Sequence, residues 1–286
     1  MFTKYLKAFV PFVSRLFIAH HIKLLYNDII KGGAFLAGKG GRIFFLDEMR
    51  ALALIGMIIY HAAYDLYAIF GLDFDFYSPG WDTLQLAVCC TFIVIAGISS
   101  RLTKNALKHG LVVFGCGMLM TLGTYFFMPS QVIWFGVLHF LGASMIIYHI
   151  FRKSVKKAPA LLGAIISLAV FFCLYGIHSG TILFGNVDVP SGLYFSKYLA
   201  VIGLPGPGFR SADYFPLLPW FFLFLSGCFI GKYFKERKIP GFMMNKHSDF
   251  LCKIGSNTLA IYIIHQPVIY GLLYAFFWVI EKGSAV

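Results

Sequence analysis

The stretch ALALIGMIIYHAAYDLYAIFG, residues 51–71, decides the fold, because it is almost wholly apolar and long enough to cross a bilayer. A helix needs about 20 such residues to span roughly 30 Å of hydrocarbon. Blocks of comparable length follow at residues 84–100, 106–128, 132–151, 159–177, 215–234 and 254–279. Each block must be helical, because an unpaired backbone group in lipid is too costly. The sequence therefore predicts an all-α, polytopic membrane helical bundle of about seven transmembrane helices.

The composition of the whole chain points the same way. Of the 286 residues, 59% are hydrophobic and only 13% are charged, and the mean hydropathy is +0.78. A water-soluble domain must cover its surface with more polar groups, so a soluble fold is excluded. The six cysteines lie in or beside the apolar blocks and show no CxxC spacing, which favours packing over disulfide or metal binding. No metal is expected.

Lys and Arg residues are distributed unevenly between the loops. Taken on alternate sides of the seven blocks, 21 of the 24 fall on one side and 3 on the other. Because short cytoplasmic loops retain basic residues, this predicts a cytoplasmic N-terminus and an extracytoplasmic C-terminus in the cell membrane. The same rule favours a re-entrant or interfacial position for the short apolar stretch 193–204. The net charge of +12 is then explained by anionic lipid headgroups, and no nucleic-acid partner is expected.

The chain is predicted to divide into three parts. Residues 1–41 alternate basic and apolar side chains, which is typical of an amphipathic helix lying at the membrane interface. Residues 42–280 form one membrane domain, and residues 281–286 form a short extracytoplasmic tail. The sequence leaves open whether the chain forms a homo-oligomer.

Ionisable residues inside the apolar blocks are the candidate functional groups, because they are costly in lipid unless they face a cavity or a partner. His61 and Asp65 lie four residues apart in the first block, which places both side chains on one face of a helix. A carboxylate there can orient an imidazole that takes a proton from an acceptor hydroxyl or amine. A buried pair that only joins two helices explains the pattern equally well.

Two further histidines lie midway along later blocks. His139 is in the fourth block, and His265, followed by Gln266, is in the seventh. All three residues are candidates to line the same cavity as His61. Each histidine is equally well explained as a hydrogen-bonding group between helices.

Charged residues cluster at the predicted cytoplasmic ends of the first two blocks. Asp47 and Arg50 are three residues apart, a spacing that allows an ion pair near the lipid headgroups, and we favour this anchoring role. The alternative is a cofactor site, in which Arg42, Arg50 and Arg101 bind the phosphates of a cytosolic cofactor, with Asp47 beside them.

Acidic and aromatic residues gather on the predicted extracytoplasmic side. Trp81 and Asp82 precede the second block, and Trp220 lies early in the sixth. Aromatic faces stack on sugar rings and carboxylates accept hydrogen bonds from hydroxyls, so these residues are candidates for substrate binding. A solvated lid with interfacial aromatics is the competing interpretation.

Several short motifs resemble a known family. LDEMRALA at 46–53, YH at 60–61, WD at 81–82 and FIVIAGIS at 92–99 resemble the transmembrane heparan-alpha-glucosaminide N-acetyltransferase-like family. GVLHF at 136–140, LPWF at 218–221 and LAIYIIHQP at 259–267 are similar to motifs of its bacterial relatives. The resemblance covers most of the expected membrane domain.

The resemblance implies an enzyme that accepts an acetyl group from cytosolic acetyl-CoA and delivers it to an amino sugar or a sugar hydroxyl. It also implies an active-site histidine. In the lysosomal branch that histidine lies just before the Trp of the first lumenal loop, where this chain has Ser78, Pro79 and Gly80 ahead of Trp81. The role does not carry over at that position, so His61 becomes the candidate catalytic residue, with Asp65 as its partner.

Two other classes of function remain open from the sequence. A proton-coupled transporter or flippase would use His61 and Asp65 as a proton relay, although no inverted repeat is visible. A non-catalytic membrane scaffold would leave these midspan residues without a task. Release of CoA during turnover would separate the enzyme from both.

Overall fold

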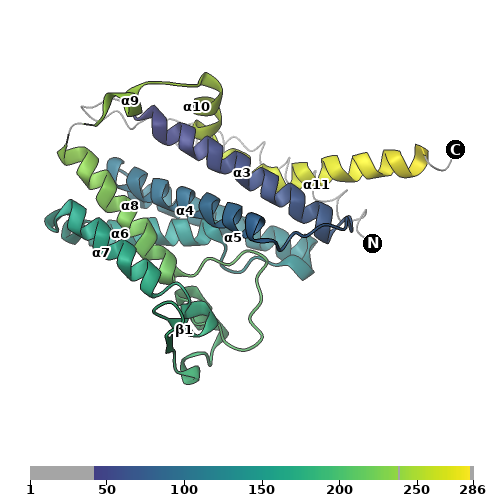
Figure 1. Cartoon of the computed structure of the whole chain (residues 1–286), viewed down its shortest axis with the longest axis horizontal. Coiled ribbons are helices and arrows are strands. Elements are labelled where there is room, and N and C mark those ends of the chain that lie inside the picture. The colour runs from purple at the N-terminus through teal and green to yellow at the C-terminus, as the bar shows by residue number, and fades with distance from the viewer. Residues whose placement is uncertain (1–41, 238, 284–286) are drawn as a thin grey trace. The chain divides into compact units, whose positions relative to one another are not determined.

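The computed structural model describes residues 42–237 and 239–283 (Figure 1). The predicted amphipathic segment at residues 1–41 lies outside this range. Within it, six helices are long and apolar enough to cross a membrane, which confirms an all-α, multi-pass membrane fold. They are α3 (Phe44–Ala68), α4 (Pro79–Leu102), α5 (Ala106–Phe127), α7 (Ala160–Cys173, extended by the 3-10 turn η2, Ile177–Ser179), α8 (Leu217–Glu236) and α11 (Thr258–Gly283).

Helix α6 (Val137–Lys157) occupies the place of the predicted fourth span but is not among the six apolar helices. It follows the 3-10 turn η1 (Pro129–Gln131) and begins five residues later than predicted. Its C-terminal part carries several Lys and Arg residues, which lower the hydropathy of the helix. The count of six by length and composition is therefore one fewer than the seven predicted.

The predicted seventh span was placed too early at its start. Residues 254–256 belong to a separate short helix, α10 (Asp249–Ser256), and α11 begins only at Thr258. Side chains define both ends of α10, because Ser248 Oγ accepts from Leu251 N at 3.3 Å and Asn257 Nδ2 donates to Lys253 O at 2.8 Å. Such capping bonds replace the backbone bonds that a helix end lacks. The far end of α11 also extends past the predicted limit, to Gly283.

The described chain forms two compact units. We call residues 42–92 and 240–283 the α3–α11 unit, and residues 93–239 the α5–α8 unit. Helix α4 passes from one to the other, since its residues up to Phe92 belong to the first and those from Ile93 to the second.

In the α5–α8 unit, α5 lies along α6 and α7 lies along α8 (Figure 1). Glycines permit the close approach, as small residues do between membrane helices. A methyl group added at Gly142 of α6 would lie 2.5 Å from the backbone nitrogen of Phe114 in α5. The unit is therefore held together by near contact of helix backbones.

The loop between α7 and α8 contains a small antiparallel hairpin and two 3-10 turns. Strand β1 (Thr181–Ile182) pairs with β2 (Val187–Asp188), and η3 (Ser191–Leu193) and η4 (Lys197–Ile202) follow. The stretch 193–204, predicted to be interfacial, thus forms no long helix. Tyr198 in it is 79% exposed, and its position at the membrane interface stays a prediction.

In the α3–α11 unit, α3 packs against α10, α11 and the short helix α9 (Gly241–Met244). Its apolar core is formed by Leu54, Met57 and Val88, which come from α3 and α4. Gly255 of α10 lies directly against the backbone of Asp47, so that α10 touches the first turns of α3. The charged residues Asp47, Glu48 and Arg50 are therefore part of helix α3, and α10 packs against the turn that carries Asp47 and Glu48.

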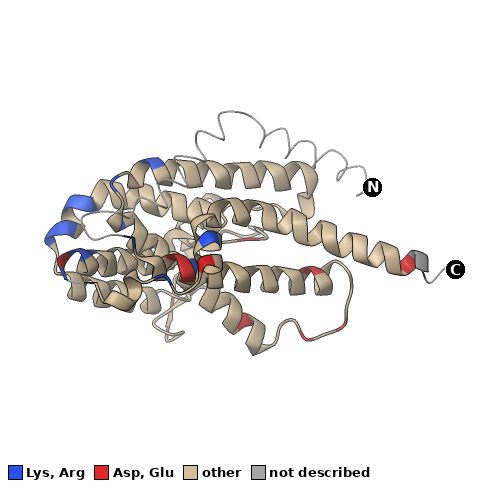
Figure 2. Cartoon of the chain, turned by 90° about the horizontal axis from the view of Figure 1, so that it is seen from above, with Lys and Arg blue, Asp and Glu red and all other residues tan. Residues whose placement is uncertain are grey.

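Basic residues lie in the last turns of three helices that belong wholly or partly to the α5–α8 unit, namely Arg101 in α4, Lys156 and Lys157 in α6 and Lys235 in α8; all Lys and Arg residues are blue in Figure 2. Hydrogen bonds connect these ends, because Lys235 at the end of α8 bonds to Arg101 O of α4 and Lys232 bonds to Lys156 O of α6. This grouping is what the alternate-loop count of Lys and Arg predicts. Which side of the membrane that end faces stays a prediction.

Candidate functional site

A cluster of four polar side chains brings together α3 and α11. His61 and Asp65 come from α3, and His265 and Gln266 come from α11. Gln266 Nε2 donates to Asp65 Oδ1 at 2.8 Å, and the rings of His61 and His265 lie 5.0 Å apart between centroids. We call these four residues the His61 cluster. All four are residues that the sequence named as candidates.

The pairing within the cluster differs from the one that the spacing predicted. No hydrogen bond connects His61 and Asp65 in the described chain, because Asp65 Oδ1 is bonded to Gln266 and Asp65 Oδ2 has no partner. The expectation that Asp65 directly orients the His61 imidazole is therefore wrong. Asp65 instead bonds Gln266, which is 201 positions away on α11, rather than His61, which is one turn away on the same helix.

The hydrogen bond of His265 fixes which ring nitrogen carries the proton. Its Nδ1 lies 2.5 Å from the carbonyl oxygen of Tyr262, which can only accept. Nδ1 must therefore hold a hydrogen, and in the neutral ring Nε2 carries the lone pair. His265 is only 7% exposed, and Nε2 has no hydrogen-bond partner among the described residues. The neutral form of His265 thus has an unused acceptor.

Three buried atoms of the cluster lack partners within residues 42–237 and 239–283: Asp65 Oδ2, His265 Nε2 and Gln266 Oε1. A buried polar atom left unsatisfied costs about 1–3 kcal/mol, and here three occur together in an apolar helix pair. All three are acceptors when Asp65 is ionised. The missing complement is therefore a group that donates hydrogen bonds, such as an amine or a hydroxyl.

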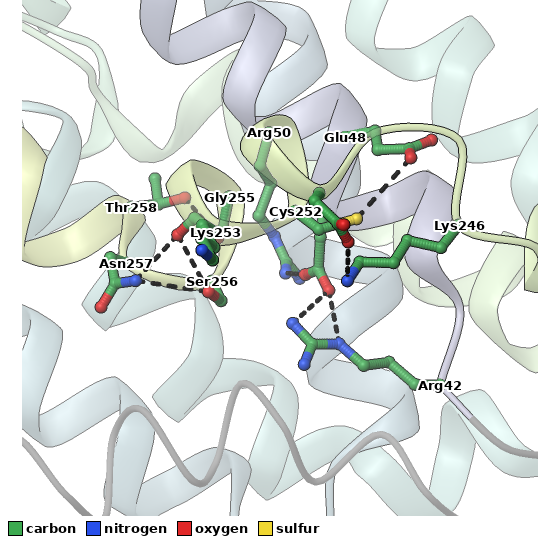
Figure 3. Close-up of polar contacts among 12 residues, drawn as sticks. Arg42, Glu48, Arg50, Lys246, Cys252, Lys253, Gly255, Ser256, Asn257 and Thr258 are labelled. Atoms are coloured by element: carbon green, nitrogen blue, oxygen red, sulfur yellow. Dashed lines mark hydrogen bonds and ion pairs between the residues drawn. The ribbon is translucent and has the colours of Figure 1, made fainter.

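At the start of α3, two arginines share one carboxylate. Arg50 Nη1 lies 2.7 Å from Asp47 Oδ1, and Arg42 Nη2 lies 2.7 Å from Asp47 Oδ2 (Figure 3). Asp47 is fully buried, whereas both guanidinium groups retain some exposure. The anchoring ion pair expected from the sequence is present, and the group carries one positive charge beyond what Asp47 neutralises.

Glu48, next along α3, holds the start of α10. Its carboxylate accepts from the backbone nitrogens of His247 at 2.7 Å and Ser248 at 2.8 Å, and it lies 2.9 Å from His247 Nδ1. The thiol of Cys252 also points at it, with Sγ 3.6 Å from Glu48 Oε1 (Figure 3). Burial raises the pKa of this thiol and the Glu48 carboxylate raises it further, so Cys252 remains protonated. These contacts are structural.

His139 belongs to the α5–α8 unit and has a different setting. Its Nε2 lies 3.3 Å from Thr121 Oγ1, and Thr121 in turn donates to Ile133 O at 2.5 Å. Thr121 thus accepts from His139, which assigns the proton to Nε2. Nδ1 has no partner but lies against Gly117 of α5. This is the interhelical hydrogen bond that the sequence offered as the alternative to cavity lining.

Asp213, an acidic residue of the predicted extracytoplasmic cluster, has a contact that the sequence did not predict. It precedes α8, and its Oδ2 accepts from Val137 N at 3.0 Å, so it caps the first turn of α6. Burial raises the pKa of Asp213 to about 6, against the opposing effect of that hydrogen bond. The two residues are 76 positions apart, so no local pattern could reveal the contact.

The residues proposed to bind a substrate lie in separate units. Trp81 stacks on Phe76 with centroids 5.8 Å apart, and Asp82 beside it is exposed, both in the α3–α11 unit. Trp220 belongs to the α5–α8 unit, where it contacts Phe215 at 5.1 Å. Arg101 is also in that unit, buried at the end of α4. The Trp81 ring is therefore partly used in packing the loop that precedes α4.

These features define a multi-pass helical membrane protein. Its buried His61 cluster has three acceptor atoms for which the described residues provide no donor. The family described as heparan-alpha-glucosaminide N-acetyltransferase, catalytic, matches residues 42–267, and the chain belongs to this family of membrane acetyltransferases. The match spans all four residues of the His61 cluster. No curated protein and no solved structure matches the chain.

Proposed function

We propose that this chain transfers an acetyl group from acetyl-CoA to an amino sugar or a sugar hydroxyl at the His61 cluster. Family membership supports the reaction class. The observation that carries the assignment to this cluster is its three unpartnered acceptors on Asp65, His265 and Gln266. An acceptor amine or hydroxyl supplies the donors that these atoms lack.

The chemistry assigns a role to each member. His265 Nε2 accepts the proton of the acceptor while the acceptor nitrogen or oxygen attacks the thioester carbonyl carbon. A new C–N or C–O bond forms, the C–S bond breaks, and the proton passes to the departing sulfur to give free CoA. Asp65 and Gln266 position the acceptor. His61, next to His265, hydrogen-bonds the carbonyl oxygen as negative charge develops on it.

The remaining sequence candidates complete the proposal. Arg42 and Arg50 supply the excess positive charge that a phosphate-bearing donor requires, with Asp47 holding both in place. Trp81 and Asp82, in the same unit as the His61 cluster, contribute to binding of the sugar. The donor is taken from the cytoplasmic side of the cell membrane, where the basic helix ends and the N-terminus lie.

The test is turnover by purified protein in liposomes, supplied with acetyl-CoA and glucosamine. Free CoA is measured by its thiol and the acetylated sugar by mass spectrometry. His265→Ala should lower kcat by about 10²–10⁴, the range of a lost general base. His149→Ala is the matched control, because His149 is an exposed histidine of α6 and should leave turnover unchanged.

Gln266→Met sharpens the assignment. It keeps the bulk of the side chain but removes the hydrogen bond to Asp65, so turnover should fall less than in His265→Ala. Melting temperatures of all variants establish that they are folded. Undiminished acetyl transfer in both His265→Ala and His61→Ala would overturn the proposal, as would a folded wild-type protein that releases no CoA with any amino sugar or sugar tested.

A further inference from the structure

The end of α4 carries a buried arginine with no counter-ion. Arg101 is 8% exposed, and its Nε has no hydrogen-bond partner among the described residues. Lys235 of α8 lies close to it, since Lys235 Nζ donates to Arg101 O at 3.0 Å. Arg152 of α6 is also close, with bonds to Thr103 O at 3.3 Å and Lys104 O at 3.5 Å. Three cations therefore meet at one helix end.

Part of this arrangement is ordinary helix capping. The bonds from Lys235 and Arg152 satisfy backbone carbonyls at and just after the C-terminal end of α4, where cations are favourable. This capping does not explain why the Arg101 side chain is buried. In the described part of the chain, no carboxylate forms an ion pair with Arg101, Arg152 or Lys235, and Glu236 is paired with Lys232 at 3.5 Å. A buried charge without an opposite charge is costly.

Two hydroxyl groups lie on the same face of α6 as Arg152. Ser144, Tyr148 and Arg152 follow at intervals of four, so they form one stripe along the helix. Ser144 and Tyr148 are fully buried, and neither hydroxyl forms a well-aligned hydrogen bond within residues 42–237 and 239–283. The Arg101 side chain nevertheless lies within reach of the Tyr148 hydroxyl as a donor, and the charge of Arg152 also acts on that hydroxyl. We call these four residues, together with Lys235, the Arg101 cluster.

The unused groups of the Arg101 cluster are donors. A guanidinium group can only donate, and a hydroxyl whose oxygen faces it still has its own hydrogen to donate to a third group. The complement is a compact anion with several acceptor oxygens. Phosphate fits this description better than a carboxylate, because it offers oxygens in three directions and a higher charge.

We propose that the Arg101 cluster binds a phosphate group. Two sources share this chemistry: the phosphates of a soluble nucleotide such as CoA, and the headgroup of an anionic phospholipid. The soluble source rests on the proposed function, whereas the lipid source does not. Neither Ser144 nor Tyr148 stood out in the sequence, although their spacing from Arg152 was visible there.

The test compares Tyr148→Phe and Arg101→Gln with Lys153→Gln. Lys153 is exposed and lies next to Arg152 on α6, so its replacement removes the same charge from the same region. One arm titrates CoA into protein in phosphatidylcholine nanodiscs. The other measures phosphatidylglycerol retained in detergent by native mass spectrometry. Loss of a hydrogen bond to a charged group should weaken binding about tenfold in Tyr148→Phe.

The outcomes separate the sources. Weaker CoA binding in Tyr148→Phe and Arg101→Gln, with Lys153→Gln unchanged, supports the nucleotide. Loss of retained phosphatidylglycerol in the same two variants supports the lipid. If neither ligand responds, the site does not bind phosphate and the proposal fails. If the wild type binds no CoA at all, the proposed acetyl transfer is in doubt, while the lipid arm still decides this site.

The melting temperature provides an independent test of the proposal. Because the Tyr148 hydroxyl forms no well-aligned hydrogen bond within the described residues, Tyr148→Phe should leave the melting temperature of ligand-free protein unchanged or raise it. The same variant should reduce the rise in melting temperature that the bound ligand produces. A lower melting temperature without ligand would reveal a structural hydrogen bond and would overturn the proposal.

Discussion

Two sites, the start of α3 and the end of α4, treat buried charge in opposite ways. At the start of α3, Asp47 is fully buried but contacts two arginines, and Glu48 contacts His247 and two backbone nitrogens. In the α5–α8 unit, Arg101 has no ion-paired carboxylate within the described residues. Asp213 there is held by the backbone nitrogen of Val137. The start of α3 pairs each buried carboxylate with neighbouring cations or donors, whereas the end of α4 leaves Arg101 without a carboxylate among the described residues.

This difference distinguishes architecture from function. A charge that is neutralised by its neighbours stabilises the contact between helices and needs nothing further. A buried polar group without a partner is costly, and its cost is offset when a ligand or a proton binds. Asp65 and His265 belong to the second kind, which is why the His61 cluster is the candidate active site. The following substitutions test the distinction.

The largest effect is expected for Asp47→Asn. It leaves Arg42 and Arg50 beside each other without their shared counter-ion, which should lower the free energy of unfolding by about 3 kcal/mol. Chemical denaturation in detergent measures it. Asp75→Asn, which alters an exposed loop carboxylate, is the control and should have no effect. Equal stabilities would mean that Asp47 is not the anchor described here.

Gly255→Ala should cost somewhat less, about 2 kcal/mol. Its new methyl group would meet the backbone of Asp47, so α10 would have to move away from α3. Gly241→Ala is the matched control, because a methyl group there meets nothing within 4 Å. Thermal unfolding followed by circular dichroism distinguishes the two. Similar melting temperatures for both variants would contradict the close contact between α10 and α3.

Asp213→Asn should have an effect that depends on pH. The pKa of Asp213 is raised to about 6 by burial, so the folded state disfavours its ionised form. The stability from this group is therefore present near pH 4 and is lost as pH rises through 6. The asparagine keeps an oxygen for Val137 N and does not ionise. Relative to the wild type, the melting temperature of the variant should rise between pH 4 and pH 7.

A constant difference between the two proteins across this pH range would contradict the raised pKa. Asp188→Asn in the exposed hairpin serves as the control, since a surface carboxylate should add no such pH dependence.

The smallest effect is expected for Lys246→Ala. The ion pair of Lys246 with Asp249 lies on the surface, with side chains 44% and 75% exposed. Water and salt screen such pairs, so the melting temperature should not change measurably. A loss comparable to that of Asp47→Asn would show that exposure is not what separates the two kinds of ion pair.

The membrane helices could be predicted closely because the bilayer itself sets their length. Residues 106–128, for example, correspond to α5 at Ala106–Phe127. The helix ends were less accurate where side chains define them, as at Ser248 and Asn257, which separate α10 from α11. Such capping is a local detail that a hydropathy pattern does not contain.

The candidate site could be predicted in its members but not in its bonds. Ionisable residues in apolar blocks are conspicuous, so His61, Asp65 and His265 were all identified. Spacing along one helix then suggested that Asp65 bonds His61, whereas it bonds Gln266 on α11. Helical spacing predicts which residues are neighbours on the same helix. It does not predict which residues of another helix they contact. The hydroxyls of Ser144 and Tyr148 were missed for the same reason.

The contact between Glu48 and the start of α10 has a consequence for synthesis of the chain. Glu48 and His247 are 199 positions apart, so the ribosome makes the partner long after α3. At roughly 5–20 residues per second, the delay is on the order of 10–40 s. During this time the newly made α3 holds a carboxylate that nothing satisfies. Messages truncated before residue 247 should therefore yield nascent chains that quality-control proteases recognise and remove.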